Sequence, residues 1–148
     1  MLDLPHKKMQ MRIQDGKKEV LDILRKKWVV LTPEEEVRQR FVHYLMDEKK
    51  FPAGLLAIEY SLKVNSLSRR ADLVAFNSFG HPILMVECKA PSVKITQNVF
   101  DQIARYNLSM KVDYLILTNG LEHFCCQMDF KKQQYYFLEE IPDYHKIN

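Results

Sequence analysis

The stretch RRADLVAFNSFGHPILMVECK, residues 69–89, decides how the chain folds. It contains two apolar runs, 73–76 and 83–86, separated by a polar segment with a glycine, which is typical of two strands joined by a short turn. Asp72 opens the first run, and Glu87 and Lys89 follow the second. Because an unpaired charge in a buried strand is costly, we predict that these side chains converge on a divalent cation.

Strand geometry places the predicted ligands on one side of the sheet. Residues i and i+2 of a strand face the same side, about 6.5–7 Å apart, so Glu87 and Lys89 project together while Cys88 faces the opposite layer. The carboxylates of Asp72 and Glu87, with the backbone carbonyl of Cys88, form a set of hard oxygen ligands that suits Mg²⁺ or Mn²⁺. A metal-activated water beside an ammonium group is suited to phosphodiester hydrolysis.

A later segment supplies two further candidates. Gln102 and Tyr106 lie four residues apart, hence on one face of a helix, where the amide could orient Lys89 or a water and the phenol could reach a phosphate. Arg69 and Arg70 are placed to contact a nucleic-acid backbone, and simple loop charges are the alternative interpretation. Each residue alone has an ordinary structural explanation, so the prediction depends on the whole pattern.

The rest of the chain supplies a framework for this hairpin. Thr32 and Pro33 have the residue types of a helix N-cap and a first helical position, and Glu35 follows the cap by three residues, as in a capping box. The other elements are expected as helices at 17–27, 33–49 and 96–110 and as strands at 56–64, 71–76, 82–89, 113–118, 122–128 and 134–138.

This order of elements predicts an α/β (α+β mixed) fold, with helices on both faces of a central mixed β-sheet. The length of 148 residues suits one domain, and we expect an N-terminal arm at 1–16 and a single domain at 17–148. The net charge is only +3, although residues 1–31 hold eight Lys or Arg against four acids. That surplus is either a solvated helix face or a phosphate-binding patch.

The cysteines and the hydropathy pattern concern the compartment. Three cysteines, two of them adjacent, are typical of a reducing environment, and no spacing typical of zinc ligands is present. No apolar stretch approaches the roughly 18–20 residues that span a bilayer, and the N-terminus lacks a signal pattern. We therefore expect a cytoplasmic protein without a membrane partner.

The candidate residues together resemble a known nuclease pattern. Asp72, Glu87-Cys88-Lys89 and the segment 102–106 are similar to the PD-(D/E)xK nuclease motif with its trailing QxxxY. More narrowly, the chain resembles the N-terminal nuclease domain of type I restriction enzyme R subunits over roughly residues 30–140. The segments that carry this narrower resemblance are 70–72, 86–91, 102–107 and 117–120.

The resemblance implies a restriction-endonuclease-like fold and a set of roles. It assigns metal binding to Asp72 and Glu87, catalysis to Lys89, and support to Gln102 and Tyr106. Many relatives add a glutamate from the first core helix, and the sequence leaves open whether Glu34 or Glu35 takes that place. The expected partners are DNA and other subunits of a restriction system.

The resemblance has one departure, and it leaves alternatives open. R subunits continue into a large motor, whereas this sequence contains no GxxxxGK loop for ATP. We expect a divalent-metal-dependent DNA endonuclease that lacks the motor. The alternatives are a catalytically silent nucleic-acid-binding or assembly module of the same fold, and a structural protein whose polar residues form ion pairs. The DNA specificity and the oligomeric state, a dimer included, stay open.

Overall fold

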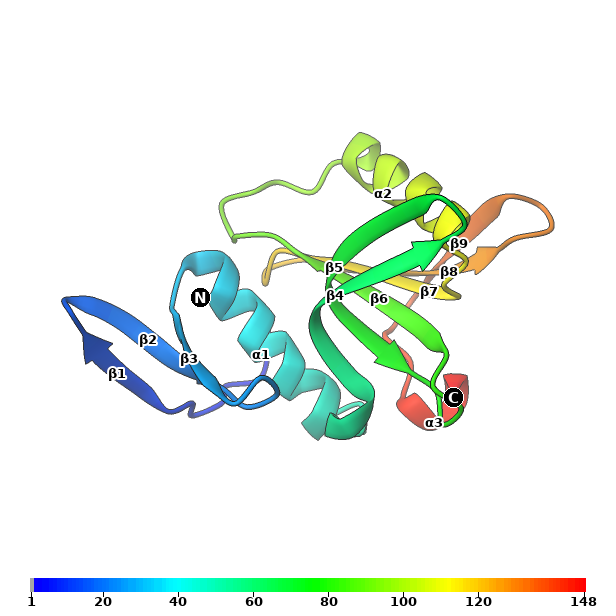
Figure 1. The fold of residues 1–148 in the computed structure, drawn as a ribbon. Coiled ribbons are helices and arrows are strands. Elements are labelled where there is room, and N and C mark those ends of the chain that lie inside the picture. The colour runs from blue at the N-terminus through cyan, green and yellow to red at the C-terminus, as the bar shows by residue number, and fades with distance from the viewer. Residues whose placement is uncertain (1) are drawn as a thin grey trace.

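The computed structural model describes residues 2–148 as two β-sheets and three α-helices (Figure 1). The larger sheet has six strands in the order β4-β5-β6-β7-β8-β9, and its β6–β7 pair is parallel while the other pairs are antiparallel. Helices α1 and α2 pack against opposite faces of this sheet. The predicted mixed sheet flanked by helices is therefore confirmed.

The elements of this main body begin and end within a few residues of the predicted positions. The larger sheet comprises β4 (Leu56–Val64), β5 (Leu67–Phe76), β6 (Pro82–Cys88), β7 (Tyr114–Thr118), β8 (His123–Asp129) and β9 (Gln134–Leu138). The helices are α1 (Pro33–Asp47), α2 (Gln97–Met110) and the short α3 (Tyr144–Ile147), with one 3-10 turn, η1 (Ala53–Leu55). No helix within residues 2–148 is long and apolar enough to cross a bilayer.

The caps of the two long helices explain where each begins. Thr32 accepts a hydrogen bond from the backbone N–H of Glu35 at 3.0 Å, and Pro33 occupies the first position of α1. Thr96 caps α2 in the same way, through the N–H of Val99 at 3.2 Å. Both caps satisfy backbone donors that the first helical turn leaves unpaired.

Strand β6 contributes to the core on both of its faces. Val86 and Cys88 are buried with the residues of α1, whereas Met85 is buried with those of α2. Because successive residues of a strand point to opposite faces, Glu87 shares the α2 side with Met85. The alternation predicted for Glu87 and Cys88 is therefore present.

The helix expected at residues 17–27 is wrong, because this segment belongs to a second, three-stranded sheet. The sheet contains β1 (Met11–Gln14), β2 (Lys17–Asp22) and β3 (Lys27–Val30), paired antiparallel in that order. Asp15 and Gly16 both have positive φ, 50° and 74°, as a two-residue hairpin turn requires. The hairpin also crosses position 16, where we placed the end of the N-terminal arm.

Candidate active site

The β5–β6 hairpin brings Asp72 and Glu87 to the same end of the sheet. The strands pair with Leu73 opposite Val86, and the two carboxyl residues flank that pair. Asp72 Oδ2 accepts a hydrogen bond from the backbone N–H of Cys88 at 2.7 Å. The side chain of Asp72 therefore lies against the end of β6, where it contacts the residue that follows Glu87.

Glu87 is buried, and its charge is only partly compensated. Its exposed fraction is 8%, and it accepts a hydrogen bond from Arg69. Burial raises the pKa of the Glu87 carboxyl; Arg69 opposes that shift, the Asp72 carboxylate adds to it, and Lys89 also opposes it. Three of the predicted site residues, Asp72, Lys89 and Arg69, thus act electrostatically on Glu87.

The guanidinium of Arg69 contacts other side chains of the protein, whereas the sequence suggested that it was free to contact a phosphate. Its guanidinium pairs with Glu87 Oε1 and lies over the ring of Tyr106, 4.9 Å from the ring centroid. The Tyr106 hydroxyl donates to the carbonyl of Ser68 at 3.0 Å, which fixes the ring beside β5. Tyr106 therefore reaches the site through Arg69, because a cation is attracted to the face of an aromatic ring. Arg70 is mostly exposed and pairs with Glu59.

The structure adds Arg38 of α1, which the sequence interpretation missed. Arg38 is 8% exposed, and its Nη1 lies 3.4 Å from Asp72 Oδ1 and 3.4 Å from Glu59 Oε1. Ion pairing with Glu35 raises the pKa of Arg38, so it is a permanent cation. The spacing of Glu35 and Arg38, i and i+3 in a capped helix, was the available signal.

Arg38 belongs to a chain of buried ion pairs that connects the small sheet to Asp72. Arg25 Nε lies 2.7 Å from Asp22 Oδ2, and Arg25 Nη2 lies 3.5 Å from Glu35 Oε1. Glu35 in turn binds Arg38 through both carboxylate oxygens, at 2.7 and 2.9 Å. These contacts hold Glu35 within the network, away from a role as a further metal ligand.

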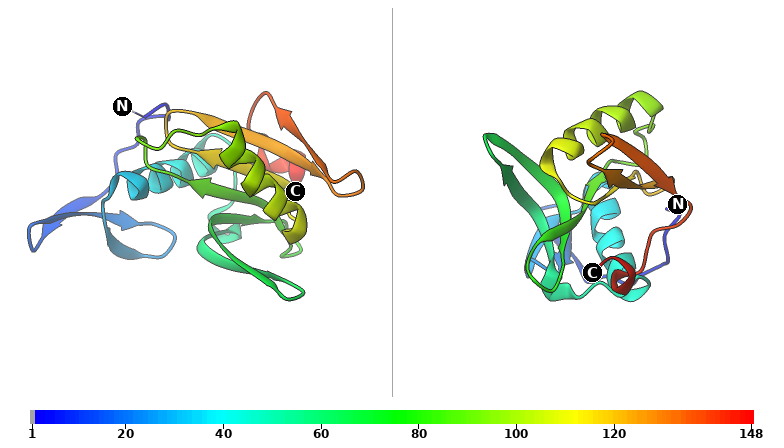
Figure 2. Two further views of the ribbon diagram at one scale, coloured as in Figure 1. Left: turned by 90° about the horizontal axis from the view of Figure 1, so that it is seen from above. Right: turned by 90° about the vertical axis from the view of Figure 1, so that its right-hand side faces the viewer.

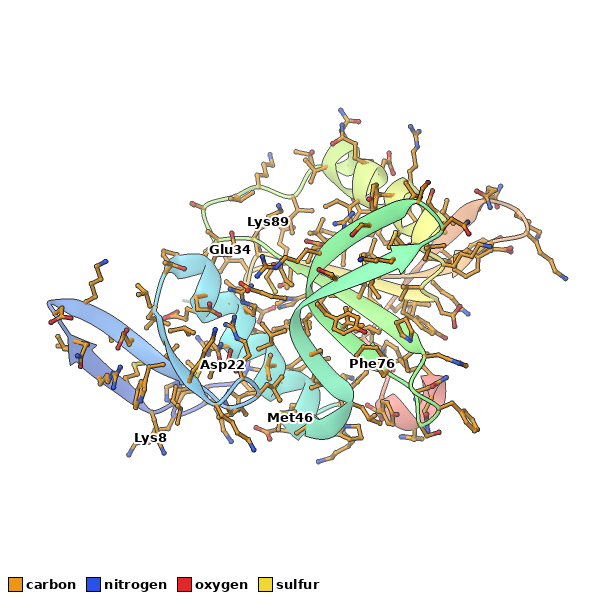
Figure 3. The ribbon with its side chains drawn as sticks, in the orientation of Figure 1. Lys8, Asp22, Glu34, Met46, Phe76 and Lys89 are labelled. Carbon is orange, nitrogen blue, oxygen red and sulfur yellow. The ribbon has the colours of Figure 1, made fainter. Side chains whose placement is uncertain are left out.

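Three other residues of the prediction have no side-chain hydrogen bond or ion pair to Asp72 or Glu87 within residues 2–148, although Lys89 lies close enough to Glu87 to act on its charge. Gln102 is exposed on α2, and no hydrogen bond of its side chain to Lys89 or to either carboxylate is recorded among residues 2–148. Lys89 is half-buried and, within the same residues, its ammonium has no recorded ion pair. Glu34 is exposed at the start of α1, and Figure 3 labels it with Lys89 at the end of the molecule where α1 begins and β6 ends. The roles of these residues stay predictions.

The segment 117–120 supports the site from β7. The N–H of Lys89 donates to the carbonyl of Thr118 at 2.8 Å, so β7 fixes the backbone beyond β6. Asn119 bonds the carbonyl of Val93 at 2.9 Å and thereby holds the loop that follows Lys89. Gly120 has φ of 86°, and a Cβ there would lie 2.7 Å from Leu2 and 2.9 Å from Val37. This close approach requires glycine.

The residues at the end of β6 fit a hard divalent cation. Two carboxylates, one of them buried with a raised pKa, form an oxygen-rich set that Mg²⁺ or Mn²⁺ prefers. No group of three or more His, Cys, Asp or Glu residues that could hold a metal ion is found in the described part of the chain, so a third protein ligand would be a backbone carbonyl, such as that of Cys88. Burial raises the pKa of the Cys88 thiol well above its ordinary value, which excludes it as a nucleophile.

Comparison with known proteins identifies the family. The sequence profile of the type I restriction enzyme R protein N terminus (HSDR_N) matches residues 33–142. The chain therefore belongs to the family of type I restriction enzyme R protein N-terminal domains. No curated protein matches it.

A solved structure has a similar fold. It is the structure of a fragment assigned as an HsdR subunit of a type I restriction enzyme from Vibrio vulnificus YJ016. The TM-score is 0.55 at 18% sequence identity, over 79% of this chain and 24% of that chain. The chain thus spans about a quarter of the length of that fragment, and the likeness concerns the fold.

Proposed function

We propose that the chain is a divalent-metal-dependent DNA endonuclease with a restriction-endonuclease-like fold. The observation that carries the proposal is the convergence of Asp72, Glu87 and Lys89 at the end of the β5–β6 hairpin, with the buried Glu87 short of compensating charge. Membership in a family of restriction enzyme R subunits supports DNA as the substrate and other restriction-system subunits as partners.

The chain's own residues divide the work of phosphodiester hydrolysis. Asp72 and Glu87 would hold Mg²⁺ or Mn²⁺ with the Cys88 carbonyl, and the ion would supply an activated water and polarise a phosphoryl oxygen. Lys89, on the same side of β6 as Glu87, stabilises the negative charge that develops on the phosphate or orients the water. Tyr106 positions Arg69, and Gln102 orients Lys89 or the water.

Cleavage assays with a matched lysine control test this function. The protein is incubated with supercoiled, linear and single-stranded DNA and with Mg²⁺, Mn²⁺ or EDTA. Lys89→Ala should lower the metal-dependent rate by about a hundredfold or more. Lys146→Ala, at an exposed position of α3, should cleave like the wild type. Cleavage that continues at the wild-type rate in Lys89→Ala would refute the proposed role of that residue.

A second function is favoured by the arginines. Arg69 pairs with Glu87 and Arg38 lies beside Asp72, so both carboxylates already have a cationic partner, as in a nucleic-acid-binding or assembly module that does not cut. Calorimetry with millimolar Mg²⁺ or Mn²⁺ separates the two functions. Binding of either ion that Glu87→Gln removes supports the endonuclease, and the absence of binding supports the silent module.

A further inference from the structure

The small sheet, residues 11–30, carries more positive charge than its ion pairs use. It contains six Lys or Arg and three Asp or Glu. Arg12 pairs with Glu19 and Arg25 with Asp22, which leaves four exposed lysines against one exposed acid, Asp15 of the β1–β2 turn. Within the described chain, no ion pair is recorded for any of these lysines, which are Lys17, Lys18, Lys26 and Lys27.

The lysines lie at the two ends of β2. Lys17 and Lys18 begin the strand after the β1–β2 turn. Lys27 of β3 lies opposite Asp22 in the strand register, at the other end of β2. A strand rises about 3.3 Å per residue, so the two lysine pairs are separated by about 17 Å. Double-stranded DNA carries one charge per about 1.7 Å of its axis when both strands are counted, so a duplex segment of this length carries about ten phosphates, of which one side faces the sheet.

The position of the small sheet relates these charges to the candidate active site. Figures 1 and 2 show that the sheet extends from the end of the molecule at which α1 begins, while the β8–β9 hairpin extends at the opposite end. The ion pairs from Asp22 through Arg25, Glu35 and Arg38 reach Asp72. The sheet is therefore attached to the site by buried contacts and would hold a bound duplex in a defined orientation.

We propose that the small sheet is a docking surface for the backbone of double-stranded DNA. The docking surface rests on the proposed function, which makes DNA the substrate. It extends that function by naming the region that holds the duplex away from the cleavage point. The surplus of unpaired lysines favours the polyanion over a protein partner, since phosphate contacts by lysine supply sequence-independent affinity.

A pair of double variants provides the test. Lys17→Gln/Lys18→Gln and Lys131→Gln/Lys132→Gln each remove two exposed lysines from the region of a hairpin turn, the second pair at the β8–β9 turn of the opposite end. The binding of a fluorescent duplex of about 20 base pairs is measured by anisotropy in EDTA, which prevents metal-dependent cleavage, over a series of salt concentrations. Circular dichroism and thermal unfolding check that both variants fold.

The expected result is a difference between the two ends of the molecule. Because Lys17 and Lys18 are consecutive in β2 and point to opposite faces, the variant loses at least one phosphate contact, which should reduce the slope of log K against log salt by about 0.9 or more and weaken binding several-fold. The Lys131/Lys132 variant should stay within about twofold of the wild type, because it lies outside the proposed contact. Equal effects of both variants, or a wild type that binds no duplex at low salt, would overturn the proposal. The absence of duplex binding would favour a protein partner instead.

The binding assay is independent of the cleavage assay. A wild type that binds DNA through the small sheet but does not cleave it with Mg²⁺ or Mn²⁺ would overturn the endonuclease and leave the docking surface standing. Cleavage that requires Lys89, together with duplex binding by the Lys17/Lys18 variant that equals that of the wild type, would overturn only the docking surface.

Discussion

Glu35 and Glu87 are both buried and both paired with an arginine, but their pKa values shift in opposite directions. Burial acts against the charge of each, but hydrogen bonds from Arg38 and Gln39 outweigh it and lower the pKa of Glu35. Glu87 receives its hydrogen bond from Arg69 and faces the Asp72 carboxylate, and its pKa is raised. The surroundings of Glu35 outweigh the cost of burying its charge, whereas those of Glu87 leave part of that cost uncompensated.

The comparison separates a region of compensated charges from the region where we propose metal binding. The network of Asp22, Arg25, Glu35 and Arg38 joins the small sheet to α1 and satisfies its charges through several contacts each. At the end of β6, the half-buried Lys89 has no recorded ion pair among residues 2–148. Replacements in the first region should therefore affect unfolding, and replacements in the second should affect metal binding.

The largest expected loss of stability is that of Glu35→Gln. The carboxylate accepts two hydrogen bonds from Arg38 and one from Gln39, and its loss leaves a buried guanidinium without its main partner. Breaking a buried ion pair costs about 3–5 kcal/mol, and we expect about 3 kcal/mol in urea unfolding. Glu36→Gln, one residue further along α1 and half-buried, is the control and should change by less than about 0.5 kcal/mol. Similar losses in the two variants would contradict the role of the network.

Asp22→Asn should cost less, and its cost should depend on pH. Burial pushes the pKa of Asp22 upward, but hydrogen bonds from Arg25 and Gln39 outweigh it and hold the pKa below its ordinary value. A lowered pKa contributes stability above the unfolded-state pKa, and this contribution is lost as the pH falls through the folded-state pKa. We expect a difference from wild type of about 2 kcal/mol at pH 7 and a smaller difference near pH 3.

The exposed turn next to β2 provides the control for this pH dependence. Asp15→Asn replaces an exposed residue with φ of 50° by one that also tolerates positive φ, so its unfolding should stay close to that of the wild type at both pH values. A difference between Asp22→Asn and wild type that is the same at pH 7 and pH 3 would show that the charge of Asp22 does not stabilise the fold.

The contrast between the two regions also explains what the sequence could predict. The β5–β6 hairpin was predictable because two apolar runs flank a short turn, and the start of α1 was predictable because Thr32 and Pro33 are local signals. The small sheet was missed because Val20, Leu21 and Leu24 fit a helical spacing. The Asp15-Gly16 dipeptide, a strong hairpin signal, should have decided in favour of strands.

The ion pairs of the site were less accessible to sequence reasoning. Strand alternation placed Glu87 and Lys89 on one side, and the hairpin placed Asp72 beside them. Burial of Arg38, however, depends on carboxylates far along the chain, since Asp72 is 34 residues away. A sequence also cannot separate an arginine that faces solvent from one that pairs with a glutamate, and for this reason the pairing of Arg69 with Glu87 was not anticipated.

Among the three buried carboxylates, Glu87 should have the smallest effect on stability when it is replaced by glutamine, and Glu87→Gln tests the comparison most directly. A raised pKa means that the folded state favours the neutral carboxyl, so the contribution of Glu87 to stability is present below its unfolded-state pKa and is lost as the pH rises through the folded-state value. A neutral glutamine at pH 7 removes the cost of burying the charge, which offsets the lost pairing with Arg69, and we expect the free energy of unfolding to change by less than about 1 kcal/mol. Millimolar Mg²⁺ should raise the melting temperature of the wild type, because a ligand that binds only the folded state stabilises it, and it should not raise that of Glu87→Gln. A loss of stability as large as that of Glu35→Gln, or an equal response of variant and wild type to Mg²⁺, would mean that Glu87 is a structural ion-pair residue like Glu35.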